Sequence, residues 1–177
     1  MIKQFFSKII LIIGLVFLIL VYQSTLIVNS ANALIREIKE APTQIVYQAK
    51  HTLRDETGKS WQIVFYKRLK SGEVDTINLR LVGFPGTVEF THPQPLKISY
   101  SQEKIFLAKD NFAEKAPATN VGEYQFPEVL FNLKKNAKVF LSLPLKTNQP
   151  AKIKIPFPVL LEWQEVINKK SKYSNPQ

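Results

Sequence analysis

The feature that most constrains the fold is a stretch of alternating apolar residues over 61–86, divided by two turn signals. Successive side chains of a strand point to opposite faces of a sheet, so this alternation predicts strands with a buried face. Ser71-Gly72 and Pro85-Gly86 each place a glycine where a tight turn needs a positive φ. The stretch therefore predicts two strands joined by the Ser-Gly turn and a further strand after the Pro-Gly turn, as in a β-meander.

The first of these strands is apolar on both of its faces near its middle. Trp61, Ile63 and Phe65 share one face, and Val64 and Tyr66 lie on the other. A strand with one solvated face alternates apolar and polar residues, whereas a strand covered on both sides reads as a continuous apolar run. We therefore predict that this strand lies at the centre of its sheet.

Further turn signals divide the rest of the chain into short strands. The predicted strands cover 44–54, 87–91, 96–101, 104–108, 122–126, 137–145 and 152–155. The stretch 109–121 has no periodicity and is predicted to be a loop, either structurally inert or functional. The segment 92–95 contains two prolines, which cannot donate to a strand ladder, so we place this turn at a sheet edge.

Helical periodicity occurs near both ends of the domain. Leu34, Ile35 and Ile38 would fall on one side of a short N-terminal helix that Pro42 ends. One or two helical turns are expected over 127–132. A final helix is predicted from apolar residues spaced along one helix face, namely Val159, Leu160, Trp163, Val166 and Ile167. The predicted fold is mainly β, an antiparallel sandwich or partly open barrel with a short N-terminal helix and a C-terminal amphipathic helix.

The first 33 residues have the three parts of a secretory signal peptide. Lys3 and Lys8 precede or border an unbroken apolar run over 9–21, and an Ala-Asn-Ala site follows at 31–33. We predict cleavage after residue 33, and the alternative is an uncleaved membrane anchor whose apolar segment continues to residue 28. In either case the remainder is expected outside the cytoplasm.

The rest of the chain is predicted to be one β-rich domain over 34–168, followed by a polar tail over 169–177. No internal repeat and no change in composition suggests a second domain. The 177 residues include no cysteine, so the chain carries no disulfide, no lipid-modified cysteine and no cysteine nucleophile.

Positive charge is concentrated in the C-terminal part of the chain. The formal net charge is +10, and residues 129–177 contain nine lysines against two glutamates. On an exported protein this bias suggests contact with an anionic lipid surface or an acidic protein face, whereas an export signal argues against nucleic acid. The alternative is that the lysines only solvate the surface and protect strand edges. The candidate contact residues are Lys134, Lys135, Lys138, Lys152 and Lys154.

The sequence offers few groups for catalysis. His51 and His92 are the only histidines, and the G-x-S-x-G turn of many serine hydrolases is absent. His51 would share a strand face with Asp55, so a hydrolase using this pair is an alternative to ordinary packing. Asp110 and Glu114 could bind a cation weakly, but no histidine or cysteine spacing indicates a metal site, and no glycine motif would hold a phosphate. We therefore predict no catalytic residues, no cofactor and no metal.

Five segments of the chain resemble a family of exported proteins of unknown function found in cyanobacteria. These are ALIREIKEAP, QIVYQAKHTLRD ahead of Trp61, LRLVGFPGTVEF, NVGEYQF and PFPVLLEWQEV, with LRLVGFPG and ALIRE the most specific. The resemblance implies a cyanobacterial home, where an exported chain reaches the periplasm or the thylakoid lumen. It implies no catalytic residues.

Together these observations favour a non-catalytic exported binding or assembly protein at a membrane or photosynthetic complex. One alternative is a carrier of a small apolar ligand, because β-barrels sometimes enclose a cavity. The other is the hydrolase that would use His51 and Asp55.

Overall fold

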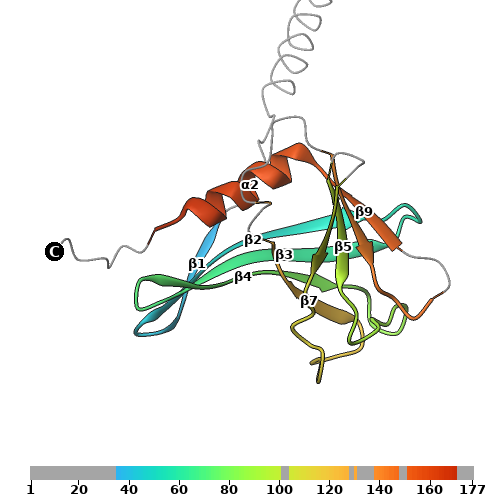
Figure 1. Ribbon diagram of the computed structural model, residues 1–177, viewed down its shortest axis with the longest axis horizontal. Coiled ribbons are helices and arrows are strands. Elements are labelled where there is room, and N and C mark those ends of the chain that lie inside the picture. Colours follow the sequence, from blue (N-terminus) through green and yellow to red (C-terminus); the bar gives the residue numbers. More distant parts are fainter. Residues whose placement is uncertain (1–34, 101–103, 128–129, 131–137, 148–150, 171–177) are drawn as a thin grey trace, which may run out of the picture. The chain divides into compact units, whose positions relative to one another are not determined.

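A computed structural model describes residues 35–100, 104–127, 130, 138–147 and 151–170 (Figure 1). These residues lie within one compact unit, Ala33–Gln177. They form nine strands in two antiparallel sheets and one C-terminal helix, and the sheets are not closed into a barrel. The prediction of a mainly β, antiparallel fold is confirmed.

The larger sheet has five strands in the order β1-β2-β3-β4-β7. Their bounds are β1 Arg36–Ala41, β2 Gln44–Arg54, β3 Ser60–Lys70, β4 Glu73–Val82 and β7 Val121–Gln125. The strand β3 is central, as predicted, and Ser71 and Gly72 both have positive φ in the turn that joins β3 to β4. The meander ends with β4. After the Pro85-Gly86 turn the chain leaves this sheet, and the strand that pairs with the other edge of β4 is β7.

The smaller sheet has four strands in the order β6-β5-β8-β9. Their bounds are β5 Leu96–Tyr100, β6 Lys104–Ala108, β8 Val139–Leu143 and β9 Ala151–Ile155. The predicted strand over 87–91 is reduced to a single bridge between Phe90 and Leu145. The turn at 92–95 leads into β5, which lies between two strands, so its predicted place at a sheet edge is wrong. Both prolines precede the strand, and the ladder therefore loses no donor.

The predicted N-terminal helix is also wrong. Residues Arg36–Ala41 form β1, which pairs with β2 so that Arg36 lies opposite Gln48. Five of the six residues of β1 are exposed, so their hydrophobic pattern is too weak to select a structure. Pairing with the edge of β2 satisfies the backbone and outweighs a local helix preference. Of the helical turns predicted over 127–132, only Pro127 and Leu130 are among the described residues.

The hydrophobic core lies on the inner face of the five-stranded sheet. Trp61, Ile63 and Phe65 are fully buried there, as the alternation predicted. Trp61 meets the ring of Phe90 edge-on, with the centroids 5.9 Å apart. Two isolated bridges join the sheets at their corners: Asp55 pairs with Ile153, and Asp110 pairs with Tyr124.

The helix α2, Phe157–Asn168, covers another part of the inner face, against β2 and β3 (Figure 1). Its Trp163 stacks on Phe65 with the centroids 4.8 Å apart and the planes 12° from parallel. Phe126 packs edge-on against both rings. Within the part of the chain described above, no helix is long and apolar enough to span a membrane.

The end of α2 explains why a lysine shares the buried face of β3. The ammonium of Lys67 donates to the carbonyl oxygens of Ile167 and Lys169, at 2.5 and 2.9 Å. The last carbonyls of a helix lack partners within the helix and carry a partial negative charge, which a buried cation satisfies. Burial lowers the pKa of Lys67 from its ordinary value.

The stack between α2 and β3 yields a stability prediction. Trp163→Ala should lower the free energy of unfolding by about 3–5 kcal/mol, because it opens a cavity against Phe65 and Phe126. Leu161→Ala, on the same helix but 47% exposed, should change it by less than about 0.5 kcal/mol. Urea unfolding of both variants measures the difference, and equal losses would contradict the packing role of α2.

Candidate anionic-surface interface

Three of the five candidate lysines lie in the described part of the chain. Lys138 precedes β8, and Lys152 and Lys154 lie on β9, whereas Lys134 and Lys135 are outside the described residues. The two lysines of β9 alternate with the buried Ala151, Ile153 and Ile155. Their side chains therefore point away from the core, as the alternation predicted.

These two lysines belong to the solvent-facing side of the four-stranded sheet, which we call the outer face. The outer face consists of Lys97, Ser99, Ile105, Leu107, Phe140, Ser142, Lys152 and Lys154. Strand pairing arranges these residues in two rows across the four strands. One row is Leu107, Lys97, Ser142 and Lys152, and the other is Ile105, Ser99, Phe140 and Lys154. Opposite side chains on neighbouring strands lie about 4.5–5.5 Å apart at Cβ, so apolar and basic groups interleave at contact range.

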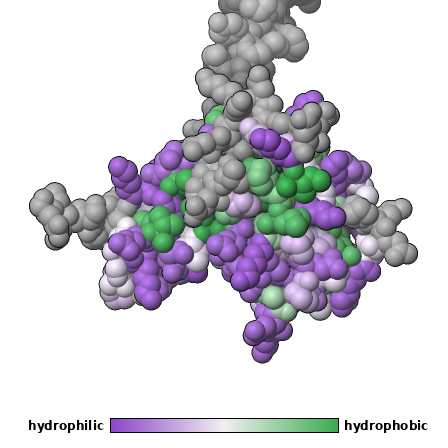
Figure 2. All heavy atoms as spheres, viewed as in Figure 1, coloured by the Kyte–Doolittle hydropathy of each residue, from purple (hydrophilic) through white to green (hydrophobic). Residues whose placement is uncertain are grey.

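The outer face exposes aliphatic side chains on its edge strand β6. Ile105 is 65% exposed and Leu107 is 61% exposed. Figure 2 shows hydrophobic side chains gathered near the position that β5 has in Figure 1, with hydrophilic ones around them. Exposed aliphatic residues on a strand edge favour contact with another molecule or with a membrane. This strand is therefore the apolar part of the candidate interface.

The charges of the outer face are all positive. Lys152 lies 3.8 Å from Glu56, an exposed residue of the β2–β3 loop, and its ammonium is 4.6 Å from the centre of the Phe140 ring. Among the described residues, no carboxylate forms an ion pair with Lys97 or Lys154. Their ammonium groups are available to an anionic partner.

Two arginines on the solvent-facing side of the five-stranded sheet are instead paired with carboxylates. Arg80 pairs with Glu123 at 2.6 Å, and Arg68 pairs with Glu40 at 2.9 Å. Both guanidinium groups also lie within 6 Å of the Tyr66 ring centre, at 5.8 and 5.6 Å. Arg68 and Arg80 thus already have partners within the described part of the chain, unlike Lys97 and Lys154 of the outer face.

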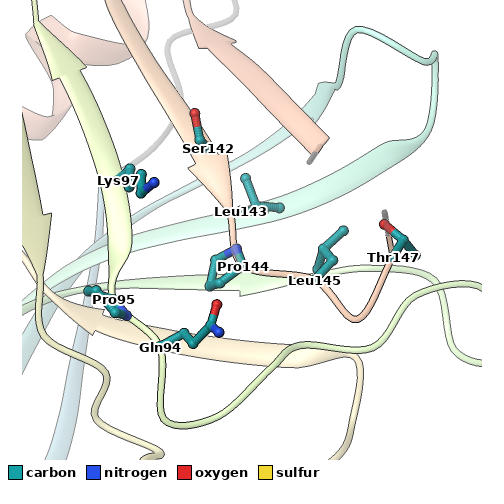
Figure 3. Close-up of a pocket in the computed structure, with 8 residues that line it drawn as sticks. All are labelled: Gln94, Pro95, Lys97, Ser142, Leu143, Pro144, Leu145 and Thr147. Atoms are coloured by element: carbon teal, nitrogen blue, oxygen red, sulfur yellow. The ribbon is translucent and has the colours of Figure 1, made fainter. Parts of the chain in front are cut away.

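An open depression of about 380 Å³ lies where β5 begins and β8 ends (Figure 3). Its lining residues come from these two strands and the segments beside them: Gln94, Pro95, Lys97, Ser142, Leu143, Pro144, Leu145 and Thr147. Lys97 and Ser142 belong to the outer face as well, so the depression adjoins one of its rows. Apolar walls and polar groups meet there.

Sequence reasoning missed Lys97, Ile105, Leu107 and Phe140. Lys97 could have been found, because it alternates with apolar residues on a predicted strand, as the lysines of β9 do. The sequence of β6, KIFLA, does not alternate polar and apolar residues, so it does not reveal which side is exposed. The grouping itself depends on the pairing between strands, which sequence alone does not supply.

The structure gives His51 and Asp55 separate partners. They are four residues apart along an extended chain, a separation of about 13 Å. The Nε2 atom of His51 lies 3.1 Å from Oε2 of Glu162 on α2, and burial lowers the pKa of His51. The carboxylate of Asp55 accepts hydrogen bonds from Thr57, Lys59 and Trp61. The two residues therefore do not form the pair that the hydrolase alternative needs.

The other histidine forms a carboxylate pair that the sequence did not predict. Nδ1 of His92 lies 2.7 Å from Oδ2 of Asp110, whose other oxygen accepts the backbone N–H of Phe112 at 2.9 Å. Burial and then the charge of Asp110 raise the pKa of Tyr124. Glu114, the other predicted cation ligand, is exposed, and no group of three or more potential metal ligands occurs in the described ranges.

The alternative of an internal ligand carrier concerns the space between the sheets. Large side chains occupy the interior of the domain: Trp61, Phe65, Phe90, Tyr124 and Trp163 are fully buried. The depressions of about 380, 410 and 440 Å³ that described residues line are open to solvent. In the described part of the interior, packed aromatic side chains fill the space that an internal ligand would need.

The arrangement defines a class of protein: two antiparallel sheets and a C-terminal helix, with a lysine-bearing and partly apolar sheet face turned to solvent. A family model described as a protein of unknown function, DUF3122, matches residues 33–166. The chain belongs to the DUF3122 family, and the predicted resemblance to a family of unknown function is confirmed to that extent. No curated protein and no solved structure matches the chain.

The Asp55 site generates a prediction on pH dependence. Burial alone would raise the pKa of Asp55, but hydrogen bonds from Trp61, Thr57 and Lys59 outweigh it and hold the pKa below the ordinary value of 3.8. The stabilisation by this carboxylate is thus complete above about pH 4 and is lost as the pH falls through the lowered pKa.

Asp55→Asn should therefore lower the unfolding free energy by about 1–3 kcal/mol at pH 7. Its deficit relative to the unchanged protein should shrink between pH 4 and pH 2, because protonation then neutralises Asp55 in the unchanged protein, as the substitution already does in the variant. Asp75→Asn, at an exposed position of β4, is the control and should have little effect at pH 7. Urea midpoints across this pH range test the prediction, and a deficit independent of pH would contradict it.

Proposed function

We propose that this chain is an exported, non-catalytic binding protein whose outer face docks on an anionic membrane surface. The observation that carries the proposal is the interleaving of lysines with exposed aliphatic side chains in two rows across one sheet face. The eight residues of this face include no acidic side chain. Basic and apolar groups side by side suit a membrane interface, where apolar groups enter the lipid and cations meet the headgroups.

Two features favour a lipid surface over an acidic protein. The cations of the outer face are lysines, which act as flexible point charges and suit a fluid array of headgroups. Protein interfaces are instead enriched in arginine, tyrosine and tryptophan anchors that fit pockets on the partner. Among the residues of the five-stranded sheet, Arg68 and Arg80 are occupied with carboxylates and with the ring of Tyr66.

The expected affinity is modest. A lysine near an anionic surface contributes about 1 kcal/mol, so Lys97, Lys152 and Lys154 together contribute about 3 kcal/mol. Partial insertion of Ile105 and Leu107 adds about 2–3 kcal/mol at about 25 cal/mol per Å² of apolar surface. Such a surface would bind reversibly and would release at high salt, because exposed charges are screened.

The contacts of the two histidines support a non-catalytic role. His51 lies against Glu162, and His92 lies against Asp110, each within the folded body. Each contact joins two segments that lie far apart in the sequence. Export is supported by the charged, apolar and small-residue parts of the first 33 residues, with the periplasm or thylakoid lumen as the proposed compartment.

Membrane docking can be tested with vesicles and charge-matched variants. Lys97→Gln with Lys154→Gln should weaken binding of the full chain to anionic vesicles about 30-fold, because two contacts of about 1 kcal/mol each are lost. Vesicle flotation at low and high salt measures the binding, with zwitterionic vesicles as the reference for any uncharged contribution.

The control removes the same net charge elsewhere. Lys50→Gln with Lys70→Gln changes two exposed lysines of the five-stranded sheet and should leave anionic-vesicle binding within about twofold. Equal losses in both double variants, or no preference for anionic over zwitterionic vesicles, would overturn the proposal. Binding to polyglutamate that depends on Lys97 and Lys154, without vesicle binding, would point to an acidic protein instead and would likewise overturn it.

Export has a separate test. In a bacterial host, the intact mass of the exported protein should correspond to an N-terminus at Leu34, because Ala31 and Ala33 supply the small residues of the cleavage site. Ala33→Leu should block processing, whereas the matched Asn32→Gln change between the alanines should not. Full-length chain in the membrane fraction would support the anchor alternative, and full-length chain in the cytosol would contradict export.

A further inference from the structure

We propose that Lys97, Ser142 and Lys152, together with the depression beside them, bind the phosphate of an anionic lipid headgroup. The inference rests on the proposed function, because it names the lipid group that the outer face would recognise. Charge alone would attract any anionic lipid, whereas this site would select lipids that carry a phosphate.

The strand register brings the three residues into one line. Lys97 on β5 lies opposite Ser142 on β8, and Ser142 lies opposite Lys152 on β9. Two lysines therefore flank one serine on three neighbouring strands. In Figure 3 the Lys97 side chain extends from β5 toward β8, the strand that carries Ser142. A phosphate above Ser142 would accept a hydrogen bond from the hydroxyl and charge-assisted hydrogen bonds from both lysines.

The second row provides an internal comparison. Ser99 occupies the same side of the same sheet, but its neighbours are Ile105 and Phe140. A phosphate above Ser99 would meet an aliphatic side chain and a ring instead of two cations. A serine with a lysine on each side therefore occurs only in the row that contains Ser142, whereas the single lysine of the other row, Lys154, lies next to Phe140.

The depression gives this row a shape as well as a charge. Its volume of about 380 Å³ is at the lower end for small-molecule sites, which suits a headgroup and excludes a whole lipid. Gln94 and Thr147 add polar groups to the lining, and Pro144 and Leu145 provide apolar walls. Figure 3 shows Gln94 on the opposite side of the depression from Ser142.

To reach the phosphate, Lys152 would give up two weak contacts, the ion pair with Glu56 and the contact of its ammonium with the Phe140 ring at 4.6 Å. Its carboxylate partner, Glu56, is 3.8 Å away, and the side chains of Glu56 and Lys152 are both exposed. An exposed ion pair of this length contributes little, so a phosphate held by both lysines can replace Glu56 as the partner of Lys152. The neighbouring Leu107 extends the same row on the other side of Lys97. Its insertion into the lipid would hold the lysines at the depth of the phosphates.

Vesicles of equal surface charge can separate phosphate recognition from general attraction. We expect the full chain to bind phosphatidylglycerol vesicles about fivefold more tightly than vesicles whose charge comes from the carboxylate of oleic acid. Ser142→Ala should abolish this preference, and Ser99→Ala, the matched change in the other row, should preserve it. Thermal unfolding of both variants checks that the sheet is intact.

A soluble ligand distinguishes this inference from the membrane proposal. Glycerol phosphate, titrated into the full chain in a non-ionic detergent, should shift the backbone amide NMR signals of Lys97 and Ser142 in the unchanged protein and not in the Ser142→Ala variant. Equal binding to both kinds of anionic vesicle, without these shifts, would overturn the phosphate site and leave the membrane proposal standing. Shifts without any vesicle binding would identify a free phosphate compound as the ligand, which overturns the lipid assignment and the membrane proposal together.

Discussion

The constraint on which the whole structure depends is the length of the buried face of β3. This strand spans Ser60–Lys70, and one face of it must be covered from Trp61 to Leu69. No single element covers that length. The four-stranded sheet joins the larger one at the corner bridges, and α2 covers a further part by stacking Trp163 on Phe65. The inner side of the smaller sheet is thereby committed to the core, and its outer face remains free for another role.

Lysine is used in two opposite ways in this fold. Lys67 is buried and its ammonium is bound by the last carbonyls of α2, so it fixes the helix to β3. Lys97 and Lys154 are exposed, and no described carboxylate pairs with them. The same residue type therefore closes the core at one place and leaves charge unsatisfied at another. Counting lysines along the sequence cannot separate these uses, because the difference lies in what the folded chain places around each ammonium.

Much of the fold could be predicted because alternation and turn chemistry are local. The bounds of β2 and the Ser71-Gly72 turn follow directly from the residue pattern. The strand β1 could not be predicted, since its side chains are almost all exposed and only its pairing with β2 selects the extended form. The candidate site was predictable only in part for the same reason. Lys152 and Lys154 follow from alternation, but their alignment with Lys97, Ser142 and Leu107 depends on register across four strands.

The positions of the exposed residues bear on whether the lysines of the outer face serve only to protect the sheet from aggregation. Lysines that protect a sheet from aggregation are expected on its edge strands. Lys97 instead lies on the interior strand β5, while the edge strand β6 presents Ile105 and Leu107 to solvent. That edge carries one lysine, Lys104, beside these two aliphatic side chains, and an exposed aliphatic edge is an aggregation hazard unless something covers it. Edge protection accounts for the lysines of β9 but not for this combination, whereas contact with an anionic lipid surface accounts for both the cations and the aliphatic residues.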